Sequence, residues 1–183
     1  MADRATEELR AALANAGYRV TVQVGKDKYD RHKRLLGHLF TRDGHNLTAR
    51  LLRKGLGFHI AIPPNLELLD CYRQAEQQAQ QKKRGIWAMP YYQARDSLSI
   101  TARDGGFVHV TGRVERVGKS RRAYFLDLPG AVSVRIDRRD SDRFATSPEN
   151  LVGASITVRG WSYRYKGRLY IKVRHPVAME ATP

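Results

Sequence analysis

Two parts of this chain concentrate cationic and aromatic side chains. The first is the stretch 26–34, KDKYDRHKR, which follows Gly25 and holds Lys28, Tyr29 and Arg31. A glycine-led charged turn beside alternating apolar residues predicts a hairpin with a basic and aromatic tip. At this tip Tyr29 either stacks on a sugar or base or packs beside the strand, and Lys28 either contacts a phosphate or is solvated.

The second concentration lies beyond residue 106, where apolar and polar residues alternate. Alternation assigns one face of each predicted strand to a core and leaves the other face to solvent. Cations that follow a backbone, beside rings that stack on bases, are what a groove for single-stranded nucleic acid needs. The alternative is that Tyr163 and Tyr165 cover a seam of a β-barrel. Beside Lys28 and Tyr29, the predicted nucleic-acid-binding residues are Arg113, Arg121, Arg122, Phe125, Arg135, Tyr163, Tyr165, Lys166, Tyr170 and Lys172.

Residues suited to acid–base, nucleophilic or metal chemistry are scattered through the chain. The six histidines form no pair at helical metal-binding spacing, and a Ser-His-Asp site does not follow from dispersed residues. Asp104-Gly105-Gly106 predicts a turn rather than a Walker loop. The single cysteine, Cys71, excludes an internal disulfide and a cysteine metal cluster, and we expect it buried or half-buried in a helix. These residues predict no metal site.

The charge of the chain favours a polyanionic partner. The net charge is +15: residues 1–96 hold 17 basic and 10 acidic residues, and residues 97–183 hold 16 and 8, so both halves are basic. Each cation set against a phosphate releases counterions, which favours nucleic acid; the alternative is a basic protein without such a partner. No apolar run is long enough to span a membrane. The start, Met1-Ala2-Asp3, precedes a helix rather than a signal sequence, so a cytoplasmic location is the default expectation.

The elements that must position the first concentration are predicted to be helices around a hairpin. Helical spacing predicts a helix over 3–16, and alternation predicts a strand over 18–24 that pairs with 35–40. A short helix follows, capped by Asn46 and ended by a left-handed Gly55.

The chain between this short helix and the second half predicts one more strand and one more helix. An apolar strand is expected over 56–62, and the next helix over 66–84 with Asn65 as its cap and Gly85 as its end. Trp87 is expected to fill the core.

Three motifs in the first half resemble one family. Asp27–Arg31, Leu51–Leu56 and Lys83–Trp87 stand in the order and spacing of staphylococcal (thermo)nuclease-like proteins, a resemblance that covers residues 3–88. One departure lies inside it, because the family usually has a glycine where this chain has Asp30. The resemblance assigns Arg31 a catalytic role on the scissile phosphate, where a planar guanidinium binds two oxygens.

What the resemblance implies for catalysis depends on residues that this chain does not have at matching positions. In the family, strands upstream of the first helix supply two calcium-binding aspartates, one phosphate-binding arginine and a glutamate base, and Arg31 matches the family's second arginine. This chain starts at the first helix, so calcium is implied but its ligands and the base are missing, and only Arg31 carries over. Ile60 and Ile62 stand where the family often places tyrosines. We expect the valine face of residues 20–24 to be partly exposed.

The second half predicts an all-β domain. Its strand candidates are 107–117, 123–128, 131–136, 155–165 and 168–174, with a short helix over 139–144 or a loop between the third and the fourth. Five strands in this arrangement match an OB-type barrel. The predicted fold is therefore mixed α+β followed by β: a partial OB-like nuclease domain with three helices at residues 1–90, and a five-stranded OB-type barrel at residues 91–183.

Three functions compete at this point. The first, which we favour, is a nucleic-acid-binding protein that binds single-stranded DNA or RNA and is weakly active or inactive as a phosphodiesterase. The second is an active calcium-dependent nuclease. The third is a protein-interaction scaffold, in which the open sheet edge pairs with a strand of another chain or forms a dimer.

Overall fold

The computed structural model describes residues 1–101 and 104–182, and the chain divides into two compact units. The first unit spans Met1–Tyr92 and the second begins at Gln93. Together the described residues form a mixed α+β structure with four α-helices. The domain boundary predicted at residue 90 stays a prediction, and residues 102, 103 and 183 of the predicted second domain lie outside the described residues.

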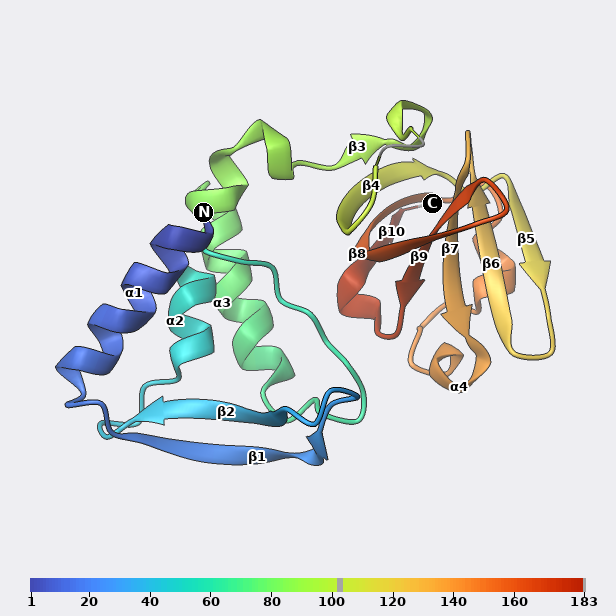
Figure 1. Cartoon of the computed structure of the whole chain (residues 1–183). Coiled ribbons are helices and arrows are strands. Elements are labelled where there is room, and N and C mark those ends of the chain that lie inside the picture. Colours follow the sequence, from blue (N-terminus) through green and yellow to red (C-terminus); the bar gives the residue numbers. More distant parts are fainter. Residues whose placement is uncertain (102–103, 183) are drawn as a thin grey trace. The chain divides into compact units, whose positions relative to one another are not determined.

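The N-terminal unit places three helices on one side of a β-hairpin (Figure 1). The hairpin strands pair antiparallel, with Val20 opposite Thr41 and Tyr29 opposite Leu35. The elements are α1 (Ala2–Asn15), β1 (Val20–Tyr29), β2 (Leu35–Thr41), α2 (Leu47–Arg53) and α3 (Leu69–Gln81), followed by 3-10 turns at Gly85–Ala88 and Pro90–Tyr92. The three predicted helices and the predicted hairpin are thus confirmed.

Local sequence signals explain the helix ends. The Asn46 side chain accepts a hydrogen bond from the Ala49 N–H and so caps α2 as predicted. Gly55, with φ of +67°, directly follows the C-cap of α2 and ends that helix as predicted. Gly85 also has positive φ, +54°, but it does not end α3 as predicted, because α3 ends at Gln81 and Lys83, with φ of +46°, is the left-handed residue there. These two glycines also lie against each other, because the Ile86 N–H donates to the Gly55 carbonyl at 2.9 Å. The two glycines therefore bring together the segment that follows α2 and the segment that follows α3.

Four other local predictions in this unit are wrong. The stretch 56–62 forms no strand apart from one isolated bridge between Ile62 and Asn65, because no described neighbour offers it a longer ladder. Asn65 does not cap α3; its amide instead holds the Asp27 backbone of β1, accepting at 2.8 Å and donating at 3.0 Å. Cys71 is exposed on α3. The hairpin turn lies at residues 30–34, since β1 continues through Lys28 to Tyr29.

The valine face of β1 is partly exposed, as expected. Val20, Val22 and Val24 keep 36%, 41% and 42% of their surface accessible. Alternation places these side chains on the face that also carries Leu39, while His38 on the other face contacts Tyr72 of α3. One face of the hairpin therefore packs on helices and the other faces solvent.

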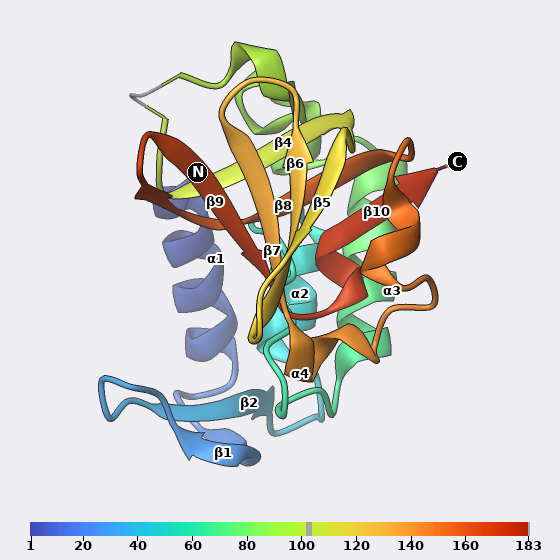
Figure 2. The same ribbon diagram turned by 90° about the vertical axis from the view of Figure 1, so that its right-hand side faces the viewer.

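The second unit contains an eight-stranded mixed sheet. Its hydrogen-bonded path is β3-β4-β8-β9-β7-β6-β5, with β10 paired to β8. Figure 2 shows these strands crossing one another at steep angles. The strands are β3 (Arg95–Asp96), β4 (Phe107–Arg113), β5 (Arg116–Lys119), β6 (Ala123–Leu128), β7 (Val132–Asp137), β8 (Ser155–Tyr165), β9 (Arg168–Val173) and β10 (Met179–Thr182), and α4 (Arg138–Ser141) follows β7.

The predicted inward residues make up the core of this unit. Leu126, Leu128, Val134, Ile136 and the other residues predicted to point inward are buried, except Val108, which packs half-buried against the core. The predicted first strand is divided into β4 and β5. Within residues 104–182 no closed barrel is found, so the OB-type barrel stays a prediction. Of the helices in the described residues, none is long and apolar enough to cross a membrane.

Candidate nucleic-acid interface

Four aromatic rings gather on the outward face of the second unit. Tyr170 on β9 stacks on Tyr163 of β8 with ring centroids 5.4 Å apart and an angle of 18° between the planes. The Phe125 ring of β6 meets the Tyr170 ring edge-on, with centroids 5.9 Å apart, and the Tyr165 ring centroid lies 6.5 Å from that of Tyr170. Tyr163 and Tyr165 remain 38% and 57% exposed. We call these four residues the ring platform; Tyr163 and Tyr165 are its exposed rings, and Phe125 and Tyr170 are half-buried.

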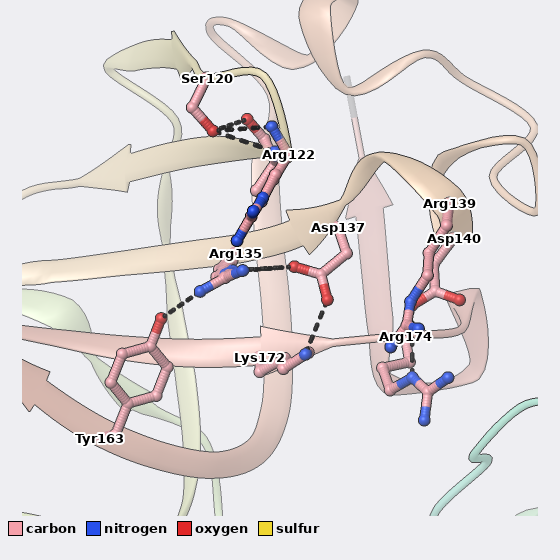
Figure 3. A network of polar contacts seen from close by, with 10 residues as sticks. Ser120, Arg122, Arg135, Asp137, Arg139, Asp140, Tyr163, Lys172 and Arg174 are labelled. Carbon is pink, nitrogen blue, oxygen red and sulfur yellow. Dashed lines mark hydrogen bonds and ion pairs between the residues drawn. The ribbon is translucent and has the colours of Figure 1, made fainter.

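Two cations, Arg135 of β7 and Lys172 of β9, border the platform, and we call them the cationic row. The two strands pair in parallel, and their register sets Arg135 directly beside Lys172. Asp137 accepts from Arg135 at 2.8 Å and from Lys172 at 2.7 Å, and Arg135 also donates to the Tyr163 hydroxyl at 3.3 Å (Figure 3). One carboxylate thus fixes two cations beside the rings, one of which contacts a ring hydroxyl.

These contacts change the ionisation of the groups involved. The hydrogen bond with Tyr163, reinforced by the charge of Asp137, raises the pKa of Arg135. Burial alone would raise the pKa of Asp137, but the hydrogen bond and charge of Lys172, with those of Arg135, outweigh burial and lower it. Arg135 and Asp137 are therefore both charged at neutral pH.

A second buried carboxylate lies on the same face. Asp127 of β6 accepts from Arg116 at 2.6 Å and from the Ser133 hydroxyl at 2.9 Å. Arg168 lies 3.4 Å from Oδ1 of Asp127, the oxygen that accepts from Ser133. The face carrying the platform is thus cationic around two carboxylates that are themselves occupied.

The predicted loop residues lie at different ends of this face. Lys166, in the turn between β8 and β9, places its ammonium 5.4 Å from the Tyr165 ring centroid, next to the platform. Arg121 and Arg122 are exposed in the turn between β5 and β6. The Arg122 carbonyl accepts from the Arg138 N–H, so that turn lies beside the carboxyl end of β7. The cations of the two turns therefore bracket the face.

Arg113 does not join this group. It stands at the end of β4 and donates from Nε to the Gly153 carbonyl at 2.9 Å. Its guanidinium therefore ties the end of β4 to the loop before β8. The other predicted residues of the second unit lie on the face of β6, β7, β8 and β9 or in the two turns at its ends.

The tip of the N-terminal hairpin presents Arg31 to solvent. Asp30 organises the turn by accepting from the His32 and Arg34 N–H groups and from the Arg34 side chain at 2.7 Å. The backbone hydrogen bond from Arg34, with those from its side chain and His32, lowers the pKa of Asp30 to about 2. Arg31 donates to the His32 ring at 2.9 Å. Lys28 and Tyr29, at the end of β1, are likewise exposed.

The residues around this tip do not fit a calcium ion. Calcium requires several oxygen ligands that converge on one point. Among residues 1–101 and 104–182, no three His, Cys, Asp or Glu side chains form a group that could hold a metal. The nearest carboxylate in sequence, Asp30, is occupied by the turn donors. Arg31 can therefore contact a phosphate, but the described residues around it do not assemble a set of calcium ligands.

A groove of about 990 Å³ lies at the other end of the same hairpin. It is hollow where α1 ends in small residues, Ala12, Ala16 and Gly17, and its rim carries Arg19 and Arg42. No sequence pattern indicates this groove, because it forms where the end of α1 meets the turn between β2 and α2.

Sequence reasoning missed the acidic partners of the interface. Asp127 and Asp137 are buried although they stand at alternating positions assigned to the solvent face. Their one sequence signal is that each occupies a strand position on the same face as a cation, such as Arg135 two residues before Asp137. The pairing strands decide which cation meets which carboxylate.

Comparison with known proteins assigns only the first unit. Residues 2–89 match the family model described as staphylococcal nuclease homologue. Those residues are a domain of that family, and the C-terminal region carries no family assignment. No curated protein matches the chain significantly.

Proposed function

We propose that this chain, which carries a staphylococcal nuclease homologue domain at residues 2–89, binds single-stranded nucleic acid on the ring platform of its second unit. The observation that carries the proposal is the packing of three rings around Tyr170 beside Arg135 and Lys172. Rings accept bases without reading their sequence, while the cations follow the phosphates. The family domain supports a nucleic-acid ligand, and the net charge of +15 favours any polyanion.

An OB-type barrel is the architecture that we propose for this unit. β4 and β5 stand at opposite sides of the sheet path, yet only Val114 and Glu115 separate them in sequence. The Val114 N–H donates to Ala154 on the β8 side, and the Glu115 N–H donates to Asp127 of β6. One bent strand that pairs on both sides would join the two ends of the sheet, as in a Greek-key barrel.

Replacing Phe125 with alanine tests the platform. We expect single-strand affinity to fall by about 1–3 kcal/mol, the contribution of one stacked base. Tyr91→Ala is the matched control, because it removes an exposed ring from the N-terminal unit. Binding is measured by fluorescence anisotropy with a labelled oligonucleotide at several salt concentrations. Equal affinities of the folded Phe125→Ala and Tyr91→Ala variants would contradict a stacking role.

Salt dependence tests the electrostatic part of the same proposal. Every phosphate that the chain neutralises lowers the logarithm of the binding constant by about 0.7 per decade of salt for a single strand. We therefore expect binding to weaken steeply between about 50 and about 300 mM salt. An affinity that does not change over this range would contradict a cationic interface, even if Phe125→Ala weakened binding.

The second candidate is calcium-dependent cleavage, which the family domain and the exposed Arg31 favour. An arginine stabilises charge on a phosphate, but cleavage needs further groups to act with it. We propose that the chain cleaves nucleic acid weakly or not at all. Robust cleavage that chelator and Arg31→Ala both abolish would establish the nuclease instead.

The third candidate is a strand-pairing partner or a dimer at the open edge of β1. The partly exposed Val20, Val22 and Val24 favour it, because an apolar strand face with a free edge pairs readily with another strand. Val22→Lys should abolish such pairing. Light scattering at rising concentration measures it, and a monomer at every concentration would contradict the dimer.

A further inference from the structure

Three arginines converge on one buried carboxylate beyond the cationic row. Asp140 of α4 is 2% exposed, and its oxygens lie 3.3 Å from Arg174 Nε, 3.7 Å from Arg143 Nε and 4.0 Å from Arg139 Nε. Arg139 belongs to α4, Arg143 follows that helix and Arg174 follows β9. Two segments, α4 with the residue that follows it closely and the end of β9, therefore direct three guanidinium groups to one carboxylate, with two positive charges in excess.

Most hydrogen-bonding capacity of these arginines is unused. A guanidinium carries five N–H donors. Arg174 donates to Asp140, whereas Arg139 and Arg143 donate no side-chain hydrogen bond within residues 1–101 and 104–182. Their side chains are 68% and 39% exposed. A carboxylate that fixes cations without saturating them leaves an organised set of donors for a second anion.

This cluster continues the cationic row along the sheet. Tyr170, Lys172 and Arg174 alternate along β9 and its end, so their side chains leave the same face. Successive side chains on one face of a strand are about 6.7 Å apart, which places Arg174 about 13 Å beyond Tyr170 along the direction of β9. Figure 3 shows Arg174 and Asp140 on the far side of Lys172 from Tyr163. The ring platform thus lies near the start of β9, and Arg139, Arg143 and Arg174 lie near its end.

We propose that Arg139, Arg143 and Arg174 form a phosphate-binding site that receives the backbone of a single strand after its bases leave the ring platform. The proposal rests on the proposed single-strand function and adds a direction to it. Bases stack at the end of the sheet near the turn between β8 and β9, and the backbone leaves over α4. Oligonucleotides that are too short to reach α4 should bind through the rings alone.

The test compares two oligonucleotide lengths on a double variant. Arg139→Gln/Arg143→Gln removes two exposed charges and keeps the contact between Arg174 and the buried Asp140, so folding is retained. Arg4→Gln/Arg10→Gln on the exposed face of α1 is the control with the same loss of charge. Affinities are measured for labelled oligothymidylates of about 4 and about 10 nucleotides; the first is at the lower limit of the roughly 4–16 nucleotides that one OB fold covers, and the second lies inside that range.

We expect the α4 variant to weaken binding of the longer strand about tenfold or more, while affinity for the shorter strand falls no further than in the α1 control. Its salt slope for the longer strand should fall by about 1.4, since two phosphate contacts are lost. An equal loss at both lengths, or no loss beyond the control, overturns the proposed path.

Inorganic phosphate separates this proposal from the proposed function. Titrated into the full chain, phosphate should shift the NMR signals of the Arg139 and Arg143 Nε–H groups, and sulfate should compete. Shifts without any oligonucleotide binding would retain the phosphate site and reject the single-strand function. Oligonucleotide binding that responds to Phe125→Ala, without phosphate shifts or a length effect, would retain the platform and overturn the phosphate site.

Discussion

The two units of this protein are held together in different ways. The second unit has one continuous core of branched aliphatic residues, including Leu126, Ile136 and Ile171, none of which is exposed. The N-terminal unit has two small clusters, one around Tyr72 and one around Trp87. Its hairpin leaves three valines partly exposed. The same chain therefore contains one unit that buries the inner face of its strands in a large core and one that does not.

Polar contacts join distant segments of the N-terminal unit, whereas a large apolar core joins those of the second unit. The Asn65 side chain holds β1, and Glu8 of α1 binds both Arg50 and Lys54 at 2.6 Å. Such contacts fix direction but contribute less stability than apolar burial. We infer that the N-terminal unit unfolds first, and that a rigid binding surface is better placed on the second unit.

Gly55→Ala should have the largest effect on this contrast. A Cβ at Gly55 would lie 2.1 Å from the Arg84 carbonyl oxygen, and the residue has φ of +67°. We expect a loss of about 4 kcal/mol or more in the N-terminal unit, which strain against backbone can produce. Gly17→Ala is the control: φ is +60° there but nothing lies within 4 Å, so about 1–2 kcal/mol is expected. Differential scanning calorimetry measures both units, and the unfolding transition of the second unit should be unchanged in both variants.

Leu126→Ala tests the core of the second unit against the open face of the first. The Leu126 side chain is fully buried, so its truncation should cost about 2–5 kcal/mol in the free energy of unfolding. Val22→Ala removes a side chain that is 41% exposed and should cost less than about 1 kcal/mol. Urea denaturation followed by circular dichroism measures both. Equal costs would mean that the valine face is covered in solution.

Tyr72→Phe should weaken the N-terminal unit by about 1–3 kcal/mol, because a buried polar group loses its partner. The Tyr72 hydroxyl lies 2.6 Å from His38 Nδ1 and accepts from the Asn46 amide at 3.2 Å. Burial also raises the pKa of this phenol. Tyr18→Phe, at an exposed tyrosine of the same unit, is the control and should leave stability unchanged. A destabilisation of equal size in both variants would contradict a structural role for the Tyr72 hydroxyl.

The smallest predicted difference is in pH dependence. Burial, with the charge of Arg143, lowers the pKa of His175 below its ordinary 6.5, whereas hydrogen bonds from Arg34 lower the pKa of Asp30 from 3.8 to about 2. Both folded-state pKa values are depressed, so each contribution is complete above the unfolded value and is lost as pH falls. The second unit should begin to lose its contribution below pH 6.5, and the hairpin only below 3.8. NMR titration of both groups measures this, and Arg143→Gln should raise the pKa of His175.

Patterns that act over a few residues determined much of the fold. Period-two alternation identified the inward residues of the sheet, and the same alternation placed Phe125, Arg135 and Lys172 on the outward face. The Asn46 cap and the left-handed Gly55 likewise follow from local backbone requirements. Each of these features depends only on neighbours along the chain, which is why the sequence alone sufficed to predict them.

Contacts between distant segments were decided by the tertiary structure. Asn65 reaches the backbone of Asp27, 38 residues away, instead of capping a helix, and 56–62 lacks the pairing that would make it a strand. Asp140 is buried because arginines from α4 and from the end of β9 converge on it. Which side chain a strand meets across a sheet depends on register and strand order, and these are fixed by packing of the whole unit. The sequence therefore determined which face carries cations and rings, and only the folded unit decided which of them meet.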